Sequence, residues 1–145
     1  MFLFEKKQLV SATPLFTTSA CIRFQDVDAA GFLFFARVFD IFHDAWLIFL
    51  KQHHIFLDDI LRHQTWVAPL RHAEADYLRP LVFNEDVSVA LTCFYLAAQE
   101  ITLGWQILNQ AQDLAAVGQT VHTFIEPKSR TRISVPEVIT ALFPN

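Results

Sequence analysis

Two carboxylates and a glycine form the part of this sequence that is best suited to chemistry. Asp26 and Asp28 lie two positions apart, and Gly31, one of only three glycines in 145 residues, follows closely. This arrangement is typical of a plain turn, because aspartate hydrogen-bonds its own backbone. It also suits catalysis, because an apolar helix is predicted to begin near Phe35. A carboxylate just before a helix lies beside free backbone N–H groups, which can stabilise a developing oxyanion.

The predicted helix ends around His54 and is apolar on most of its circumference. Its apolar residues recur at spacings of three and four. A helix of this kind is buried, either in a protein core or in a membrane. Charged residues interrupt the apolar run before it reaches the roughly 20 residues that a membrane span requires. We therefore expect a core helix and no membrane span.

The other elements follow from periodicity and turn residues. Strands are predicted at 18–25, 66–78, 87–96, 101–108 and 114–125, and short helices at 55–63 and 137–142. Residues 1–18 are expected to form an extended, loosely ordered lead-in. One long helix against a mostly antiparallel sheet is an α+β architecture, and a helix that is apolar nearly all round predicts a sheet curled around it. The whole chain, 1–145, is predicted to be a single domain.

Composition narrows the function classes. The chain is 53% hydrophobic and contains fifteen phenylalanines, which favours apolar surface buried between subunits. Its net charge of −4, with no basic block beyond the C-terminal strand, disfavours nucleic acid as a partner. Cys21 and Cys93 form no Cys-x-x-Cys unit, so we expect two reduced, buried thiols in a cytoplasmic protein. The apolar stub at the N-terminus is too short for a secretion signal.

The run Phe24-x-Asp26-x-Asp28-x-Ala30-Gly31, followed by an aromatic-rich turn and a long helix, resembles a known signature. It is similar to that of hot-dog-fold acyl-CoA thioesterases of the 4-hydroxybenzoyl-CoA thioesterase type, which include 1,4-dihydroxy-2-naphthoyl-CoA hydrolases and the Tol–Pal-associated thioesterase. The resemblance implies a hot-dog fold, an antiparallel sheet wrapped around one central helix. It also implies that a CoA thioester is the substrate, with no cofactor. Because a second subunit would cover the remaining apolar surface, we expect a dimer or a homotetramer, the latter a dimer of hot-dog dimers.

The resemblance also implies roles for particular residues. Asp28 would be catalytic, either as the nucleophile that attacks the thioester carbonyl or as the general base that activates water. The backbone N–H of Phe35 would polarise that carbonyl, and Phe is compatible with this role because only a backbone group is needed. Asp26 is assigned to ordering the turn. The residues expected to bind the substrate are Gly31, Phe32, Phe34, Trp66 and His72.

Several of these assignments have alternatives. His72 and Glu74 share one face of a predicted strand, and Tyr77 lies on the other face. The alternative is that the face of His72 is solvated polar surface. Glu74 is an alternative base, although the related thioesterases that use a glutamate carry it on the central helix. The aromatic residues favour a benzoyl or naphthoyl group. The alternative is that they belong to the core, which leaves a medium-chain acyl group open.

Three cations near the C-terminus are predicted to hold the CoA phosphates: Lys128, Arg130 and Arg132. The alternative is an ordinary solvated edge. The hydroxybenzoyl-CoA enzymes carry a basic cluster between their middle strands, where this chain has Leu96-Ala97-Ala98-Gln99-Glu100. The CoA contacts have therefore either moved to 128–132 or are weak.

Other classes of function fit less well. No His-x-x-x-His or Cys/His spacing predicts a metal site, and no Gly-x-Ser-x-Gly elbow predicts a serine hydrolase. A non-catalytic hot-dog module that binds acyl-CoA or an acyl carrier is the main alternative to an enzyme. A hot-dog dehydratase is a third possibility, but those enzymes use a different motif.

Overall fold

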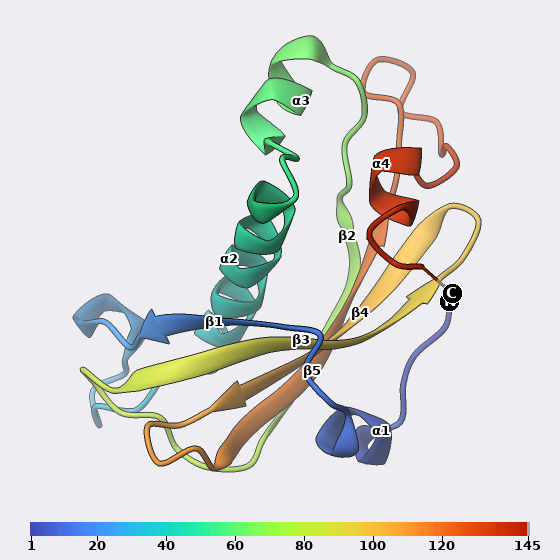
Figure 1. Ribbon diagram of the computed structural model, residues 1–145. Helices are drawn as coiled ribbons and strands as arrows, with labels where there is room; N and C mark the ends of the chain where they lie inside the picture. The colour runs from blue at the N-terminus through green and yellow to red at the C-terminus, as the bar shows by residue number, and fades with distance from the viewer. Residues whose placement is uncertain (145) are drawn as a thin grey trace.

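The computed structural model describes residues 1–144, in which five antiparallel strands form one sheet and a long helix crosses one of its faces (Figure 1). The strand order across the sheet is β1-β3-β4-β5-β2. The strands are β1 (Phe16–Cys21), β2 (Leu70–Tyr77), β3 (Asp86–Leu96), β4 (Glu100–Leu108) and β5 (Leu114–Thr123). The long helix is α2 (Arg37–Gln52), and the shorter ones are α1 (Lys6–Ser11), α3 (Leu57–His63) and α4 (Glu137–Thr140). The predicted α+β class and the order of the main elements are confirmed.

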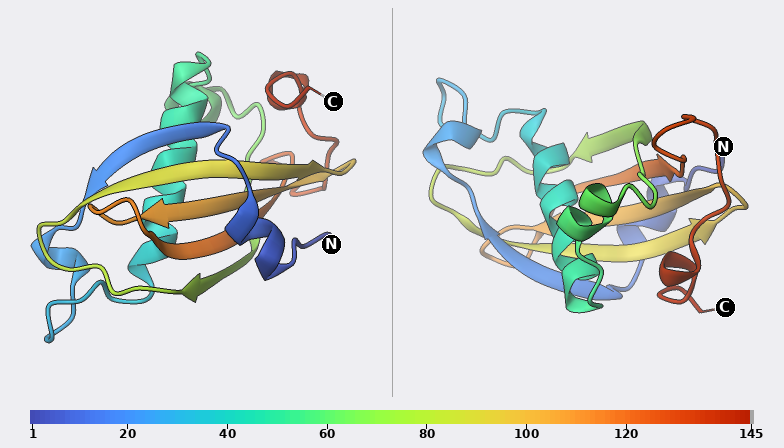
Figure 2. Two further views of the ribbon diagram at one scale, coloured as in Figure 1. Left: turned by 60° about the horizontal axis from the view of Figure 1, so that its bottom comes forward. Right: turned by 90° about the horizontal axis from the view of Figure 1, so that it is seen from above.

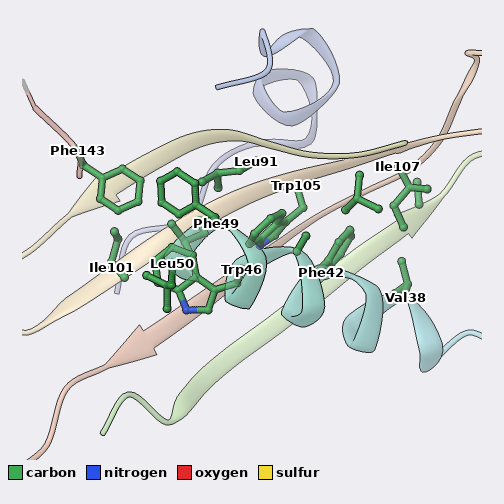
Figure 3. Close-up of a cluster of buried hydrophobic side chains, with 14 of the residues drawn as sticks. Val38, Phe42, Trp46, Phe49, Leu50, Leu91, Ile101, Trp105, Ile107 and Phe143 are labelled. Carbon is green, nitrogen blue, oxygen red and sulfur yellow. The ribbon is translucent and has the colours of Figure 1, made fainter. Parts of the chain in front are cut away.

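The hydrophobic core lies between α2 and the sheet (Figure 3). Phe42 of α2 is fully buried, and its ring stacks on Trp105 of β4 with centroids 5.8 Å apart. This close packing depends on Gly118 of β5, because a Cβ at that position would lie 2.6 Å from the Phe42 ring. Further along the helix, Trp46 stacks on both Phe49 and Phe143, and the Phe49 ring packs at a tilt against Phe143. Residues at helical spacing thus become the inner layer of the fold.

The opposite face of the sheet is covered by the N-terminal strap, which we define as residues 2–12 and which contains α1. Figures 1 and 2 show α1 and α2 on opposite sides of the sheet. Gln119 of β5 accepts a hydrogen bond from the N–H of Phe4 at 2.7 Å and donates one to its carbonyl at 3.0 Å. Gln106 of β4 donates to the carbonyl of Leu9 at 2.7 Å. The expectation of a loosely ordered lead-in was wrong, because two buried glutamine amides bind its backbone.

The first strand also differs from its prediction. It spans Phe16–Cys21, and residues Phe24–Asp26 form a 3₁₀ turn instead of its end. Phe24, which lies within the predicted strand 18–25, is outside the observed strand and 77% exposed. The cause is Asp26, whose carboxylate binds the backbone and guanidinium of Arg23 and so turns the chain.

The two cysteines are free thiols, as predicted. Cys93 is half-buried, but Cys21 is exposed, so its predicted burial was wrong. It occupies the last position of an edge strand and points away from the core. Among residues 1–144, no helix has the length and hydropathy needed to cross a membrane.

Candidate active site

Asp26 is the anchor of the turn before α2. Its carboxylate accepts hydrogen bonds from the backbone N–H of Arg23 at 2.9 Å, from Nε at 3.0 Å and from Nη2 at 3.1 Å. These bonds hold the pKa of Asp26 below its usual value. Its backbone carbonyl also accepts the N–H of Phe34 at 2.8 Å, which ties the start of the loop to its end. The geometry supports the turn-ordering role assigned to Asp26.

Asp28 uses only one of its two carboxylate oxygens to hold the turn. Oδ1 accepts the N–H of Ala30 at 2.9 Å and that of Phe32 at 3.2 Å. Gly31 supports this turn with a φ of 82°, a backbone conformation that glycine adopts without strain. Oδ2 takes part in no hydrogen bond or ion pair within residues 1–144, and the residue is exposed. One oxygen therefore orders the turn while the other remains free to react.

Free N–H groups lie at the start of α2, beside this turn. The helix begins at Arg37, two residues later than predicted, and Arg37 donates to the carbonyl of Phe34 at 2.9 Å. In the described chain, the backbone N–H of Phe35 donates to no acceptor. An unpaired N–H at a helix N-terminus is suited to bind a developing oxyanion.

Tyr77, at the end of β2, fixes the backbone at this point. Its hydroxyl donates a hydrogen bond to the carbonyl of Phe35 at 2.5 Å. Desolvation raises the pKa of Tyr77, so the hydroxyl keeps its proton. The sequence analysis missed this residue, although it placed Tyr77 on the strand face opposite His72. That face turns out to be the one that meets the helix.

A cavity of about 320 Å³ adjoins these groups, and it is bordered by Phe32, Phe35, Tyr77 and Pro80. Phe34 does not line this cavity, but its ring packs on that of Phe35 with centroids 4.7 Å apart. Phe34 and Phe35 are also strongly exposed, at 45% and 62%. These aromatic residues therefore lie at the molecular surface beside the Asp28 turn and not in the core.

A second, more apolar cavity of about 290 Å³ lies at the other end of α2. Trp66 lines it and is only 6% exposed, so the structure separates Trp66 from Phe32 and Phe34. The other side chains around it include His43, Trp46, Leu57, Leu61 and His122. The eight residues of β2 lie between the two cavities, a span of roughly 26 Å at strand rise. The substrate pocket expected from sequence is thus divided between two places.

His122 of β5 is the buried polar residue of this second cavity, and the sequence analysis did not select it. It is 2% exposed, and burial lowers its pKa to about 4. The signal was present, because His122 is the one titratable side chain in an otherwise uncharged strand.

His72 lies on the opposite face of the sheet from α2. Its Nε2 is 2.9 Å from Glu74 Oε2, and Glu74 Oε1 accepts a hydrogen bond from Gln119, which also binds the N-terminal strap. The structure therefore does not bring His72 or Glu74 to Asp28 within this chain. A substrate contact by His72 stays a prediction.

The predicted cations divide into two groups. Arg132 donates to Glu100 at 3.1 Å, and Arg71, which sequence analysis did not select, donates to the same oxygen at 2.5 Å. Glu100 is buried, so it holds two half-exposed guanidinium groups side by side. Lys128 and Arg130 lie in an exposed turn and form no ion pair within the described residues. Neither group lies at the Asp28 end of β2. In the same residues, no cluster of three or more His, Cys, Asp or Glu side chains is arranged to hold a metal ion.

A sheet around one long helix, with a carboxylate turn just before free helix N–H groups, defines a hot-dog-fold thioester hydrolase. The chain belongs to the Thioesterase-like superfamily, whose family model matches residues 22–143. It is 33% identical over 118 residues to the 1,4-dihydroxy-2-naphthoyl-CoA hydrolase of Rippkaea orientalis, covering 80% of this chain and 86% of that one. It is 30% identical to the hydrolase of the same name from Nostoc punctiforme, covering 86% and 83%.

Solved structures agree with this assignment. A 1,4-dihydroxy-2-naphthoyl-CoA thioesterase from Synechocystis superposes with a TM-score of 0.81 at 25% identity, covering 87% of this chain and 93% of that one. A DHNA-CoA thioesterase from Staphylococcus aureus superposes with a TM-score of 0.76 at 17% identity, covering 87% and 89%, which shows the shared fold. The resemblance to the family and the predicted hot-dog fold are confirmed.

Proposed function

We propose that this thioester hydrolase cleaves an aromatic acyl-CoA to the free acid and CoA, with Asp28 as the reacting carboxylate. The observation that carries the proposal is that a free Asp28 oxygen and the unpaired N–H of Phe35 both lie in the short segment just before α2. The names of the relatives, 1,4-dihydroxy-2-naphthoyl-CoA hydrolases, support an aromatic acyl group.

In this mechanism the thioester carbonyl oxygen accepts a hydrogen bond from the N–H of Phe35. Asp28 Oδ2 either attacks the carbonyl carbon, giving an anhydride that water then hydrolyses, or removes a proton from the attacking water. In both routes the C–S bond breaks, CoA leaves as the thiolate, and that thiolate is then protonated. Charge moves onto the carbonyl oxygen during attack, and one such backbone donor is worth about 3 kcal/mol in the transition state.

We also infer that a second copy of the chain completes the site. The two cavities lie at opposite ends of β2, roughly 26 Å apart at strand rise, and a bicyclic aromatic acyl group is shorter than this separation. The arginines at Glu100 lie at the far end of β2 as well. Because β2 is an edge strand, it can pair antiparallel with β2 of a second copy around a twofold axis. Such pairing would place Arg71 and the His122 cavity of one copy near Asp28 of the other.

We therefore propose a homodimer with two composite sites, in which Arg71 and Arg132 bind the CoA phosphates. Guanidinium groups suit this role because they form paired hydrogen bonds with phosphate oxygens. Lys128 and Arg130, in their exposed turn, would not bind the phosphates directly but would add positive charge near them. The predicted homotetramer would be a dimer of such dimers.

A thiol-release assay over matched aromatic and aliphatic acyl-CoAs tests this proposal. We expect aromatic thioesters to be hydrolysed with a higher kcat/KM than medium-chain ones. Faster hydrolysis of an aliphatic thioester would overturn the substrate class. If folded protein released no thiol from any CoA ester, the thioesterase proposal itself would be refuted.

A further inference from the structure

The cavity at the far end of α2 combines apolar walls with one buried polar side chain. Its volume is about 290 Å³, and its walls include the indole rings of Trp46 and Trp66. His122 faces this space although it is only 2% exposed, and its ring lies 5.8 Å from that of Trp46. In an apolar pocket, a few fixed polar groups decide which ligand binds and how it is oriented.

The hydrogen bond that His122 makes determines which of its nitrogens carries the proton. Nδ1 lies 3.4 Å from the carbonyl oxygen of Ala68. A carbonyl oxygen can only accept, so Nδ1 is the donor. Burial lowers the pKa of His122 to about 4, so the ring is neutral near pH 7 and carries a single proton. Nε2 is therefore a hydrogen-bond acceptor.

This acceptor is open to the cavity. Nε2 takes part in no hydrogen bond between the described residues. Among residues 1–144, every side-chain nitrogen or oxygen that is sealed from solvent has a hydrogen-bond partner. Because Nε2 has none, it is not sealed from solvent. Since His122 lines the cavity and is otherwise covered, the opening of Nε2 is toward the cavity. A ligand that fills the space must supply a donor or leave this nitrogen unpaired.

We propose that Nε2 of His122 accepts a hydrogen bond from a ring hydroxyl of the acyl group and so selects hydroxyaryl-CoA thioesters. This inference rests on the proposed function and deepens it, because it assigns the residue that determines acyl specificity. The two indole rings provide flat walls for an aromatic ring, and His122 provides the one buried acceptor. An unsubstituted aryl or aliphatic acyl group would bury that acceptor without a partner, which costs more than a lost contact.

Binding of free carboxylic acids tests the proposal without requiring turnover. The probes are 2-naphthoate, a set of monohydroxy-2-naphthoates, and their monofluoro counterparts. Fluorine is close in size to a hydroxyl group but has no proton to donate. Binding is measured by isothermal titration calorimetry, with quenching of Trp46 and Trp66 fluorescence as a second readout. We expect one hydroxynaphthoate to bind wild-type protein about tenfold more tightly than its fluoro counterpart.

Two variants assign that preference to His122. His122→Phe keeps an aromatic ring without an acceptor, and the hydroxyl preference should fall to about onefold. His122→Gln retains an acceptor oxygen and should keep part of the preference. His63→Phe is the matched control, because His63 is exposed on α3 and lies outside the cavity lining. Thermal melts establish that each variant is folded.

Two results would overturn the inference: equal affinity of hydroxy and fluoro acids for wild-type protein, or an unchanged preference in folded His122→Phe. The first needs no variant, so the proposal stays testable even if His122→Phe does not fold. Failure of the thioesterase proposal looks different. In that case the acids would bind with the expected preference, but no CoA thioester would be hydrolysed.

Discussion

Substituting Asp28 by asparagine or by alanine should separate its two roles. In the structure Oδ1 accepts two backbone N–H groups of the turn, and Oδ2 is unpaired. Asparagine can keep an oxygen at the Oδ1 position and place its amide nitrogen where Oδ2 was. Asp28→Asn should therefore preserve the turn and lose the reacting group. Asp28→Ala should lose both.

The expected magnitudes differ by variant and by observable. Asp28→Ala removes two hydrogen bonds, each worth on the order of 1 kcal/mol, so the free energy of unfolding should fall by about 2 kcal/mol. Asp28→Asn retains these bonds and should change it by less than about 0.5 kcal/mol. Both variants should lower kcat by about 10²- to 10⁴-fold, the usual contribution of a positioned general base. A nucleophilic carboxylate would give a loss at the upper end.

The assays are thiol release for kcat and urea denaturation for the free energy of unfolding. Asp113→Asn is the matched control, since it removes the same charge from an exposed turn where the carboxylate makes no hydrogen bond within residues 1–144. Wild-type kcat in Asp28→Asn would refute the catalytic role. A loss of stability in Asp28→Asn as large as in Asp28→Ala would refute the division of labour between the two oxygens.

Three further predictions concern Tyr77, Gly118 and His122. Tyr77→Phe removes the hydrogen bond to the Phe35 carbonyl. In a thiol-release assay it should lower kcat about five- to tenfold with little change in KM. A change in KM alone would contradict a positioning role. Gly118→Ala puts a Cβ 2.6 Å from both the Phe42 ring and the Glu74 carbonyl. The free energy of unfolding, measured by urea denaturation, should therefore fall by about 1–3 kcal/mol. Unchanged stability would show that the helix can shift. Burial lowers the pKa of His122 from 6.5 to about 4, so as the pH falls the unfolded state binds a proton at this residue before the folded state does. The free energy of unfolding should therefore fall by about 3 kcal/mol between pH 6.5 and pH 4. The same denaturation series on His122→Gln should lack this decline, and an identical decline would assign it to other groups.

The site could be predicted from sequence where it is local in the chain. The Asp28 turn, Gly31 and the start of α2 lie within about a dozen residues, so a single motif contains them. Periodicity also gave the long helix and the later strands to within a few residues, because each has one apolar side. The first strand was misplaced because Asp26 binds Arg23, and alternation of residue types does not report such a bond.

The parts that were missed depend on contacts between distant residues. Tyr77 reaches Phe35 across 42 positions, and Arg71 shares Glu100 with Arg132 across about 30. Alternation along β2 predicted that His72 and Tyr77 face opposite ways, but it cannot say which face meets the helix. That choice is made by the pairing of β2 with β5 and by the closeness of Gly118 to Phe42.

The N-terminal strap has a consequence for the order of folding. Its backbone is bound by Gln106 and Gln119, which lie 97 and 115 positions later than the residues they hold. Neither amide is in place until β4 and β5 have paired, so the strap can dock only after these two later strands have formed. Contacts of such long sequence separation form late, because the entropy of closing a large loop is lost before the contact contributes any stabilising free energy. Until then, the outer face of the sheet is open to other chains, and docking of the strap is the step that closes it.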